Sequence, residues 1–554
     1  MLIDANADYR GTDDFYSHET SAYKIYWRGF IYTPGSQAGL ACIAKLAADL
    51  QGRSLDKIAA DLRGCFLLLV HEKVSGTCYV LVDNSGLYQA FYSDKAISSS
   101  FLDLASFQGL RVADLDPRTV VEFLHFGNVN FNRTLFRDIR KLPAEKIARL
   151  SPTRGISFID KSLPSFEEPA GCSLEESLRD FATSVSTERV SVDLTGGMDT
   201  RIMAILLHYF GLPFEVAIRG NESDIDVQIA REVAGVFGKE LQVCRPRIDS
   251  LEADLGQVLG ICDGLMDVVT SYGSLQLQYE RVERGITLMV SGAAGELFRD
   301  HFWLQDLPFY SRNKPNVRRL CDLRLLPTDP DHSCLAGKYR EISVGYRQRL
   351  FQELSQYAVA GNTQTYDQIT YRVLYREMIG RFLTNHTHVL ACSAPYMERE
   401  AVRWGYQLPR FTRFFDIHFR QIATKYLPEA ARRRTTKDCT LSTEMPFLIK
   451  DIFKYCDDKF TRISRRLGQK YFHLRYRSCG KLDQPLGHTE LFPTLRRSQL
   501  VRSAVARLKD AGIMNPSLNA EKVKDQHLGT VLTLGLLMER LEVTQPQDAV
   551  SNWT

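Results

Sequence analysis

Residues 195–200 combine glycines, hydroxyls and a carboxylate in a spacing that suits phosphate binding. Gly196 and Gly197 let the backbone approach an anion closely, and the hydroxyls of Thr195 and Thr200 add hydrogen-bond donors. Asp199 repels a bare phosphate, but its carboxylate would hold a Mg²⁺ ion that accompanies one. The segment therefore predicts a site for a phosphate chain and a metal ion.

Alternating strands and helices must position this segment. The apolar pattern predicts a strand over 190–194 that enters the turn and a helix from 201 onward. A second strand over 214–218, a helix over 227–238 and a third strand over 240–245 follow. Such repeats predict a parallel, doubly wound sheet, in which ligands bind at the carboxyl ends of the strands.

The Thr-Gly-Gly-Met-Asp-Thr turn resembles the Ser-Gly-Gly-x-Asp-Ser pyrophosphate loop of the ATP pyrophosphatases. That group includes asparagine synthetase, β-lactam synthetase and the lasso-peptide cyclases, which cleave ATP to AMP and pyrophosphate and form an adenylate. The resemblance implies ATP on residues 194–200, Mg²⁺ on Asp199, and adenine beside the backbone of Ala217 and Ile218. A glycine-rich turn of another α/β protein is the alternative for so short a motif.

Residues 288–303 resemble a second segment of asparagine synthetase, Ser-Gly-x-Gly-x-Asp-Glu-Leu-Phe-Gly-Gly-Tyr. Ser291, Gly292 and Glu296 match that segment. Gly295 stands where the family has an aspartate that helps to hold Mg²⁺ and pyrophosphate. Glu296 is therefore a catalytic candidate, and its alternative role is to stabilise the start of a helix.

Two further catalytic candidates come from the later part of the chain. Residues 425–442 resemble a segment whose lysine stabilises the charge that develops on the phosphate, and Lys437 is the match. A solvated basic loop is the alternative there. Glu377 is the candidate general base, and its alternative is a surface glutamate on a helix. The complete set of predicted nucleotide-binding residues is Leu194, Thr195, Gly196, Gly197, Asp199, Thr200, Ala217, Ile218, Ser291 and Gly292.

The N-terminal third resembles the class II glutaminase domain of asparagine synthetase in residues 61–92 and 123–150. That domain is a sandwich of antiparallel sheets, and alternating strands are expected over 65–70 and 77–81. The family uses a cysteine at the mature N-terminus as nucleophile. Because the first cysteine here is Cys42, we expect a degenerate domain that does not hydrolyse glutamine.

These patterns predict an α+β antiparallel sandwich followed by an α/β doubly wound synthetase domain with a helical C-terminal part. We place the glutaminase-like domain at 1–165 and the synthetase-like domain at 172–545. Ser173 to Glu176 read as a capping box that starts the first helix of the second domain. Residues 304–345 read as an insertion or long loop, and 530–542 as a packed helix.

Composition limits the partners. A net charge of +4, from 70 basic and 66 acidic residues, is too balanced to favour nucleic acid. The sequence has no apolar run of about 20 residues, as a membrane helix needs, and no hydrophobic signal core at its start. The 12 cysteines form no Cys-x-x-Cys pair, which favours reduced thiols in a cytoplasmic protein.

The sequence therefore predicts a carbon–nitrogen ligase that uses ATP and Mg²⁺, adenylates a carboxylate and passes it to an amine. Its predicted substrate is a small-molecule or peptide carboxylate, and a cyclase would also meet a precursor peptide and partner biosynthetic proteins. Two alternatives stay open. One is an asparagine synthetase that uses free ammonia, and the other is a non-catalytic scaffold derived from the same family.

Overall fold

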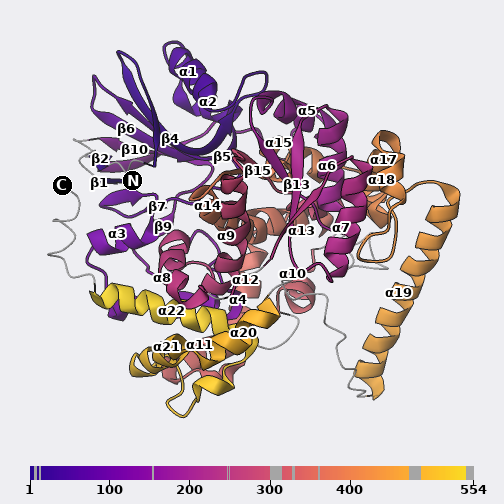
Figure 1. Ribbon diagram of the computed structural model, residues 1–554. Coiled ribbons are helices and arrows are strands. Elements are labelled where there is room, and N and C mark those ends of the chain that lie inside the picture. Colours follow the sequence, from indigo (N-terminus) through magenta and orange to yellow (C-terminus); the bar gives the residue numbers. More distant parts are fainter. Residues whose placement is uncertain are drawn as a thin grey trace.

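The computed structural model describes residues 1–4, 9–10, 14–151, 155–245, 247–248, 250–299, 315–326, 331–359, 362–472 and 488–543. Two antiparallel sheets come first, a parallel sheet with helices follows, and the C-terminal part is largely helical (Figure 1). None of the helices in these ranges combines the length and apolar character needed to span a bilayer.

The two N-terminal sheets face each other across a shared core. Ile3 and Ile97 of one sheet belong to the same apolar cluster as Leu67 and Val80 of the other. The five-stranded sheet has the order β2 (Tyr9–Arg10), β1 (Leu2–Asp4), β8 (Ala96–Ser98), β7 (Phe91–Tyr92), β9 (Arg140–Lys141). The six-stranded sheet has the order β11 (Gly155–Asp160), β10 (Lys146–Ser151), β6 (Thr77–Val82), β5 (Arg63–Glu72), β4 (Tyr23–Tyr32), β3 (Tyr16–Glu19).

Strand β5 is buried on both faces, because helices cover the side of its sheet that faces away from the other sheet. Leu67 points into the core between the sheets, whereas Leu68 packs into a second cluster with Ile43 and Ile58. Those two residues come from α1 (Leu40–Asp49) and α2 (Leu55–Asp61), which lie over the six-stranded sheet (Figure 1). The other N-terminal helices are α3 (Phe101–Phe107), η1 (Val112–Asp114) and α4 (Pro117–Phe126).

Strands of the third sheet all run parallel. Their order is β14 (Leu241–Cys244), β13 (Phe214–Arg219), β12 (Val190–Asp193), β15 (Leu288–Val290), β16 (Ala391–Ser393). The chain builds one half of this sheet outward from β12 and then returns to β12 to build the other half. The direction of winding therefore changes between β12 and β15, where ligand sites of open α/β sheets form.

Helices connect these parallel strands. Helix α5 (Leu174–Ser184) precedes β12 and begins with the predicted capping box, in which Ser173 and Glu176 bond each other's backbone N–H. The connections that follow are α6 (Asp199–Tyr209), α7 (Ile225–Val236), α8 (Leu251–Cys262), α9 (Val268–Glu283), η2 (Gly295–Phe298), α10 (Val317–Leu320), η4 (Cys321–Leu325), η5 (His332–Cys334), α11 (Gly337–Val344), α12 (Tyr346–Ser355), α13 (Asn362–Ile369), η6 (Thr370–Tyr375) and α14 (Arg376–Thr387).

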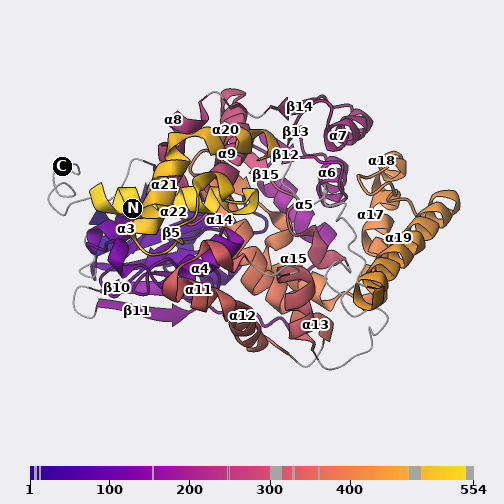
Figure 2. The same cartoon turned by 90° about the horizontal axis from the view of Figure 1, so that it is seen from below.

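The last three helices, α20 to α22, form a layer below the sheets, and one long helix, α19, extends along the side of the molecule (Figures 1 and 2). Helix α22 confirms the packed helix predicted over 530–542, since Val531, Leu534 and Leu537 are fully buried. The elements are η7 (Pro395–Met397), α15 (Arg399–Gln407), α16 (Arg410–Arg413), η8 (Phe414–Asp416), α17 (Ile417–Tyr426), α18 (Pro428–Arg432), α19 (Met445–Phe472), α20 (His488–Arg497), α21 (Gln499–Asp510), η9 (Ala520–Lys522) and α22 (Asp525–Val543).

The N-terminal sheets and the parallel sheet are not separate bodies. Strand β16, at the edge of the parallel sheet, packs beside β4 and β5. Leu67 of β5 and Val192 of β12 belong to one continuous apolar cluster. Next to η7, Glu398 accepts a hydrogen bond from Tyr32 at 2.7 Å, and Ser85 donates to the carbonyl of Met397 at 2.6 Å. The segment between the two predicted domains, 165–172, is therefore a connection across a buried interface.

A buried lysine lies where β11 leads into that connection. The Lys161 ammonium donates to the carbonyl of Val82 at 2.6 Å and to Asn84 Oδ1 at 3.0 Å. Burial lowers the pKa of Lys161 to about 7. Between that pH and about 10, where an unfolded lysine titrates, the unfolded chain binds the extra proton, so stability rises with pH.

We expect Lys161→Met to abolish this rise. Above pH ~7.5, the free energy of unfolding of the wild type should rise with pH more steeply than that of the variant, by up to about 1.4 kcal/mol per pH unit. Denaturant titrations at several pH values measure both slopes. Lys57→Met, at an exposed position of α2, is the control and keeps the wild-type slope. If the free energy of unfolding rises equally with pH in Lys161→Met and in the wild type, the prediction is wrong.

Candidate functional site

The predicted phosphate-binding turn lies at the carboxyl end of β12, between that strand and α6. The segment that follows β15 lies directly beside it: a Cβ built on Gly292 would be 2.7 Å from the Cα of Thr200. Only a glycine allows this approach. The structure thus brings two of the sequence-predicted segments, 194–200 and 291–296, together at the point where the sheet changes its direction of winding.

Hydroxyl groups hold the turn in shape. Thr200 Oγ1 accepts from the backbone N–H of Thr195 at 3.0 Å and lies 3.1 Å from Thr195 Oγ1. Thr195 Oγ1 in turn accepts from the N–H of Gly197 at 3.2 Å. Met198 is the N-cap residue of α6, and its side chain accepts no hydrogen bond from the first turn of that helix. The backbone N–H groups of that first turn therefore present the positive end of the helix dipole to the site.

A carboxylate from α7 already binds one N–H group of the turn. Asp226 Oδ1 accepts from the N–H of Gly196 at 2.7 Å. A Cβ on Gly196 would be 2.8 Å from that oxygen and 2.8 Å from Thr436, so only a glycine fits here. Burial raises the pKa of Asp226, although its bond to Gly196 opposes the shift. The sequence did not predict that Asp226 bonds to the turn 30 residues earlier.

The loop that carries Lys437 lies against the same turn. The N–H of Thr436 donates to the carbonyl of Gly196 at 3.1 Å. Arg201, which is fully buried in α6, donates to the carbonyls of Arg433 at 2.6 Å and Arg434 at 2.8 Å. Lys437 itself is exposed, and its charge is one of those that act on Asp199. The structure thus brings the loop of Lys437 against the turn of residues 194–200.

Glu296 lies in the same site, on the short helix η2. The left-handed conformation of Ala294, with φ of 73°, starts that helix. Tyr375 donates its hydroxyl to Glu296 Oε2 at 3.0 Å, and Arg299 Nη2 lies 3.8 Å from Glu296 Oε1. Burial and the Glu296 carboxylate raise the pKa of Tyr375 far above its usual value, so its hydroxyl stays protonated.

Asp199, the predicted metal ligand, is bonded to an arginine. Arg299 Nη2 lies 2.7 Å from Asp199 Oδ2, and Arg299 is 6% exposed. The other carboxylate oxygen is buried with no hydrogen-bond partner in the described part of the chain, and it lies against Gly295, where a Cβ would overlap the carboxylate. One oxygen thus holds a guanidinium and the other faces the main chain. The residues around Asp199 do not fit a Mg²⁺ ion bound by this carboxylate.

The electrostatics of the site follow from this crowding. Burial raises the pKa of Asp199 to about 7, and Glu296 and Asp416 act in the same direction, whereas Arg299 and Lys437 oppose it. For Arg299, burial opposes the charge, but the three carboxylates raise its pKa and keep the guanidinium protonated.

Ala217 and Ile218, the predicted adenine neighbours, lie inside the sheet. The carbonyl of Ala217 accepts from the N–H of Leu194 at 3.0 Å, which fixes the start of the turn. Ala217 packs with Cys244 and Leu277, and Ile218 is almost fully buried. Both side chains are therefore part of the packed interior at this edge of the sheet.

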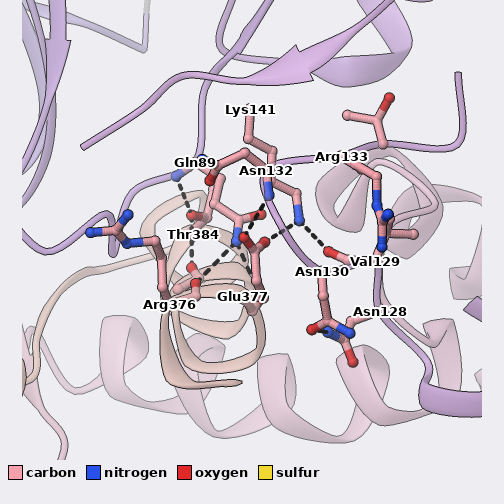
Figure 3. Close-up of polar contacts among 12 residues, drawn as sticks. Gln89, Asn128, Val129, Asn130, Asn132, Arg133, Lys141, Arg376, Glu377 and Thr384 are labelled. Atoms are coloured by element: carbon pink, nitrogen blue, oxygen red, sulfur yellow. Dashed lines mark hydrogen bonds and ion pairs between the residues drawn. The ribbon is translucent and has the colours of Figure 1, made fainter. Parts of the chain in front are cut away.

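Glu377, the candidate general base, is neither on the surface nor directed at the turn. Its carboxylate forms an ion pair with the Lys141 ammonium and accepts from the N–H of Asn132 at 3.0 Å (Figure 3). Lys141 also donates to the carbonyl of Val129 at 2.6 Å. Both carboxylate oxygens of Glu377 are occupied by the N-terminal region, and the residue is 1% exposed. Its role in this structure is to join α14 to that region.

A cavity of about 760 Å³ lies elsewhere, at the boundary between the six-stranded sheet and the segment around α15. Basic and acidic side chains both line it, including Lys45, Arg63, Glu398 and Arg403. It contains none of the predicted nucleotide-binding residues. Arg63 Nη1 is buried there without a hydrogen-bond partner among the described residues.

Sequence reasoning missed Arg299, Asp416, Asp226 and Tyr375. Each reaches the site from a separate element, and for all but Arg299 no local pattern in the sequence points to the site. The sequence does contain one signal for Arg299. This basic residue follows shortly after Gly295, which stands where the resembled family has an aspartate. Among the described residues, no cluster of three or more His, Cys, Asp or Glu side chains has the geometry of a metal site.

Comparisons with known proteins leave the family open. A scan against models of known protein families finds no match for this chain. A search of curated protein sequences finds none either.

Proposed function

We propose that this protein binds the phosphates of ATP at residues 194–200, adenylates a substrate carboxylate and transfers the acyl group to an amine. The observation that carries the proposal is the turn itself. It lies at the carboxyl end of β12, opens on the uncapped first turn of α6, and is bonded to the loop of Lys437. Oriented N–H groups and a lysine beside them favour the charge that grows on a departing pyrophosphate.

The chemistry needs two displacements. A carboxylate oxygen of the substrate attacks the α-phosphorus and pyrophosphate leaves, and an amine then attacks the acyl carbon and AMP leaves. In this proposal Lys437 stabilises the phosphate charge, and Glu296, held by Tyr375, accepts a proton from the amine. Glu377 has no part, because its carboxylate is paired with Lys141. Divalent ions enter only as companions of the nucleotide, since Asp199 is bonded to Arg299.

The N-terminal region is proposed as a glutaminase-like scaffold without a working nucleophile. Cys42 is buried, and burial raises the pKa of its thiol to about 11. A buried thiol with this pKa is poorly suited to attack glutamine. The proposed amine donor is therefore a substrate, such as a peptide or small-molecule amine, rather than ammonia released from glutamine.

The test is carboxylate-dependent exchange of labelled pyrophosphate into ATP, with a mixture of peptide and small-molecule carboxylates. We expect exchange by the wild-type protein and a loss of about tenfold to a hundredfold in Lys437→Gln, because one charge at the phosphate is removed. Lys450→Gln, at an exposed position of α19, is the matched control. Equal rates in all three proteins contradict the role of Lys437, and no exchange by the wild type contradicts the proposed function.

A second candidate function is a binding module without turnover. The observation that favours it is the occupied state of the turn, in which Asp226 binds Gly196 and Arg299 binds Asp199. Calorimetric titration with ATP separates the candidates when it is combined with the exchange assay. A module binds ATP without exchange, whereas the synthetase shows both.

A further inference from the structure

The candidate site contains a cation that belongs to the chain. The Arg299 guanidinium lies among three carboxylates that come from separate elements. Its Nη2 is 2.7 Å from Asp199 Oδ2 and 3.8 Å from Glu296 Oε1, and its Nη1 is 3.7 Å from Asp416 Oδ1. In the family that the sequence resembles, carboxylates at this point face a metal ion, and here they face an arginine.

Two backbone features make this arrangement possible. Gly295 has no side chain, and any Cβ there would overlap the Asp199 carboxylate that Arg299 binds. Phe415 and Asp416 both have left-handed backbone conformations, with φ of 55° and 57°. Such conformations are rare and unfavourable for residues other than glycine, and they persist where the surrounding structure enforces them. Here they place the Asp416 carboxylate beside the guanidinium.

The guanidinium retains unused donors next to the phosphate turn. Its Nε is buried and has no hydrogen-bond partner among the described residues. Among the residues that the structure describes, its Nη1 has the sulfur of Met198, at 3.2 Å, as its one partner within hydrogen-bond distance, and sulfur is a weak acceptor. Met198 is the N-cap residue of α6, so these donors lie at the start of the helix whose N–H groups are also uncapped.

We propose that Arg299 is a resident cation of the phosphate site and takes the place of a protein-bound Mg²⁺ ion. Asp199, Glu296 and Asp416 hold the guanidinium, and its remaining N–H groups bind the oxygens of a diphosphate-type anion on the 194–200 turn. A planar guanidinium matches two phosphate oxygens at once and remains charged at every physiological pH. The site then binds the anion without a divalent ion held by the chain.

This inference shares the phosphate turn with the proposed function, but it concerns anion binding alone. The test therefore uses inorganic pyrophosphate and the full chain, with isothermal titration calorimetry in EDTA and again in Mg²⁺. We expect the wild-type dissociation constant to change by less than about threefold between the two buffers. In EDTA, Arg299→Gln is expected to bind about tenfold more weakly or worse, and Arg299→Lys to fall between the two.

A second measurement follows the carboxylates without any anion. Arg299→Gln leaves Asp199, Glu296 and Asp416 together without their cation, so we expect this variant, and not the wild type, to bind Mn²⁺ in electron paramagnetic resonance titrations. Should Arg299→Gln fail to fold, the wild-type comparison in the two buffers decides alone.

Wild-type pyrophosphate binding that weakens more than about tenfold in EDTA would overturn the inference. So would a lack of binding in both buffers, or Mn²⁺ binding by the wild type that Asp199→Asn abolishes. Metal-independent pyrophosphate binding in a protein without ATP exchange supports this inference and removes the proposed function, so the two can fail separately.

Discussion

Glu377→Gln should lower the free energy of unfolding by about 3–5 kcal/mol. The Glu377 carboxylate and the Lys141 ammonium form an ion pair in which both side chains are almost fully buried. Glutamine keeps the size of the side chain and the acceptor for Asn132, but it leaves the ammonium in the interior without a countercharge. Chemical denaturation followed by circular dichroism measures the loss.

The double variant Lys141→Met, Glu377→Leu separates the charge from the packing. Replacing both partners with apolar residues of similar size removes the buried charges together, so we expect the double variant to be more stable than Glu377→Gln. Glu252→Gln, at an exposed position of α8, is the matched control and should change stability by less than about 0.5 kcal/mol. Full stability of Glu377→Gln with a hundredfold loss of exchange would instead return Glu377 to the reaction.

Arg201→Met should destabilise the protein by at least about 3 kcal/mol and release the loop of Lys437. The Arg201 guanidinium donates to the carbonyls of Arg433 and Arg434, and more distantly to Ala430 and Gly196 at 3.4 Å. Methionine fills part of the volume but supplies no donor, so buried carbonyls lose their partners.

Limited trypsin digestion measures that release, because the loop contains three arginines and a lysine between 432 and 437. We expect rapid cleavage there in Arg201→Met under conditions in which the wild-type loop is protected. Arg179→Met, at an exposed position of α5, is the control and should be digested as the wild type is. A wild-type digestion pattern for Arg201→Met would show that other contacts hold the loop.

The elements around the phosphate turn were predictable because each has a strong local pattern. The strand expected over 190–194 is β12, which ends one residue earlier, at Asp193. The helix expected from 201 begins at Asp199, because the Thr200 hydroxyl bonds back to Thr195 within the first turn. The strands expected over 65–70 and 77–81 pair as the antiparallel β5 and β6.

Of the two alternatives for 304–345, an insertion or a long loop, the loop is wrong in the part that the structure describes. Residues 317–325, 332–334 and 337–344 form short helices, and 304–314 and 327–330 lie outside the described residues. Leu320 and Tyr339 anchor these helices in the core. The sequence did not predict these helices because the segment is rich in charged residues, and a single buried residue per turn gives little periodicity in so short a helix.

Tertiary contacts decide the remainder of the site, and they are not visible in the sequence. Arg299 reaches a carboxylate 100 residues earlier in the chain and another on η8. Glu377 lies in a helix near Tyr375, yet it points to Lys141 while Tyr375 points to Glu296. Residues two positions apart in sequence thus bond to different regions of the chain, and the packing of η6 and α14 decides which side chain faces which region.

The short segment at η7 has a consequence for how such a chain can change over generations. Tyr396 donates to the carbonyl of Asp199 at 3.1 Å, while its neighbours Met397 and Glu398 are bonded to Ser85 and Tyr32 of the first sheets. Removing the residues before 160 would expose a buried surface that packs next to the turn of residues 194–200. The N-terminal region would therefore be retained in evolution even if it carried no activity, because the rest of the protein packs against it.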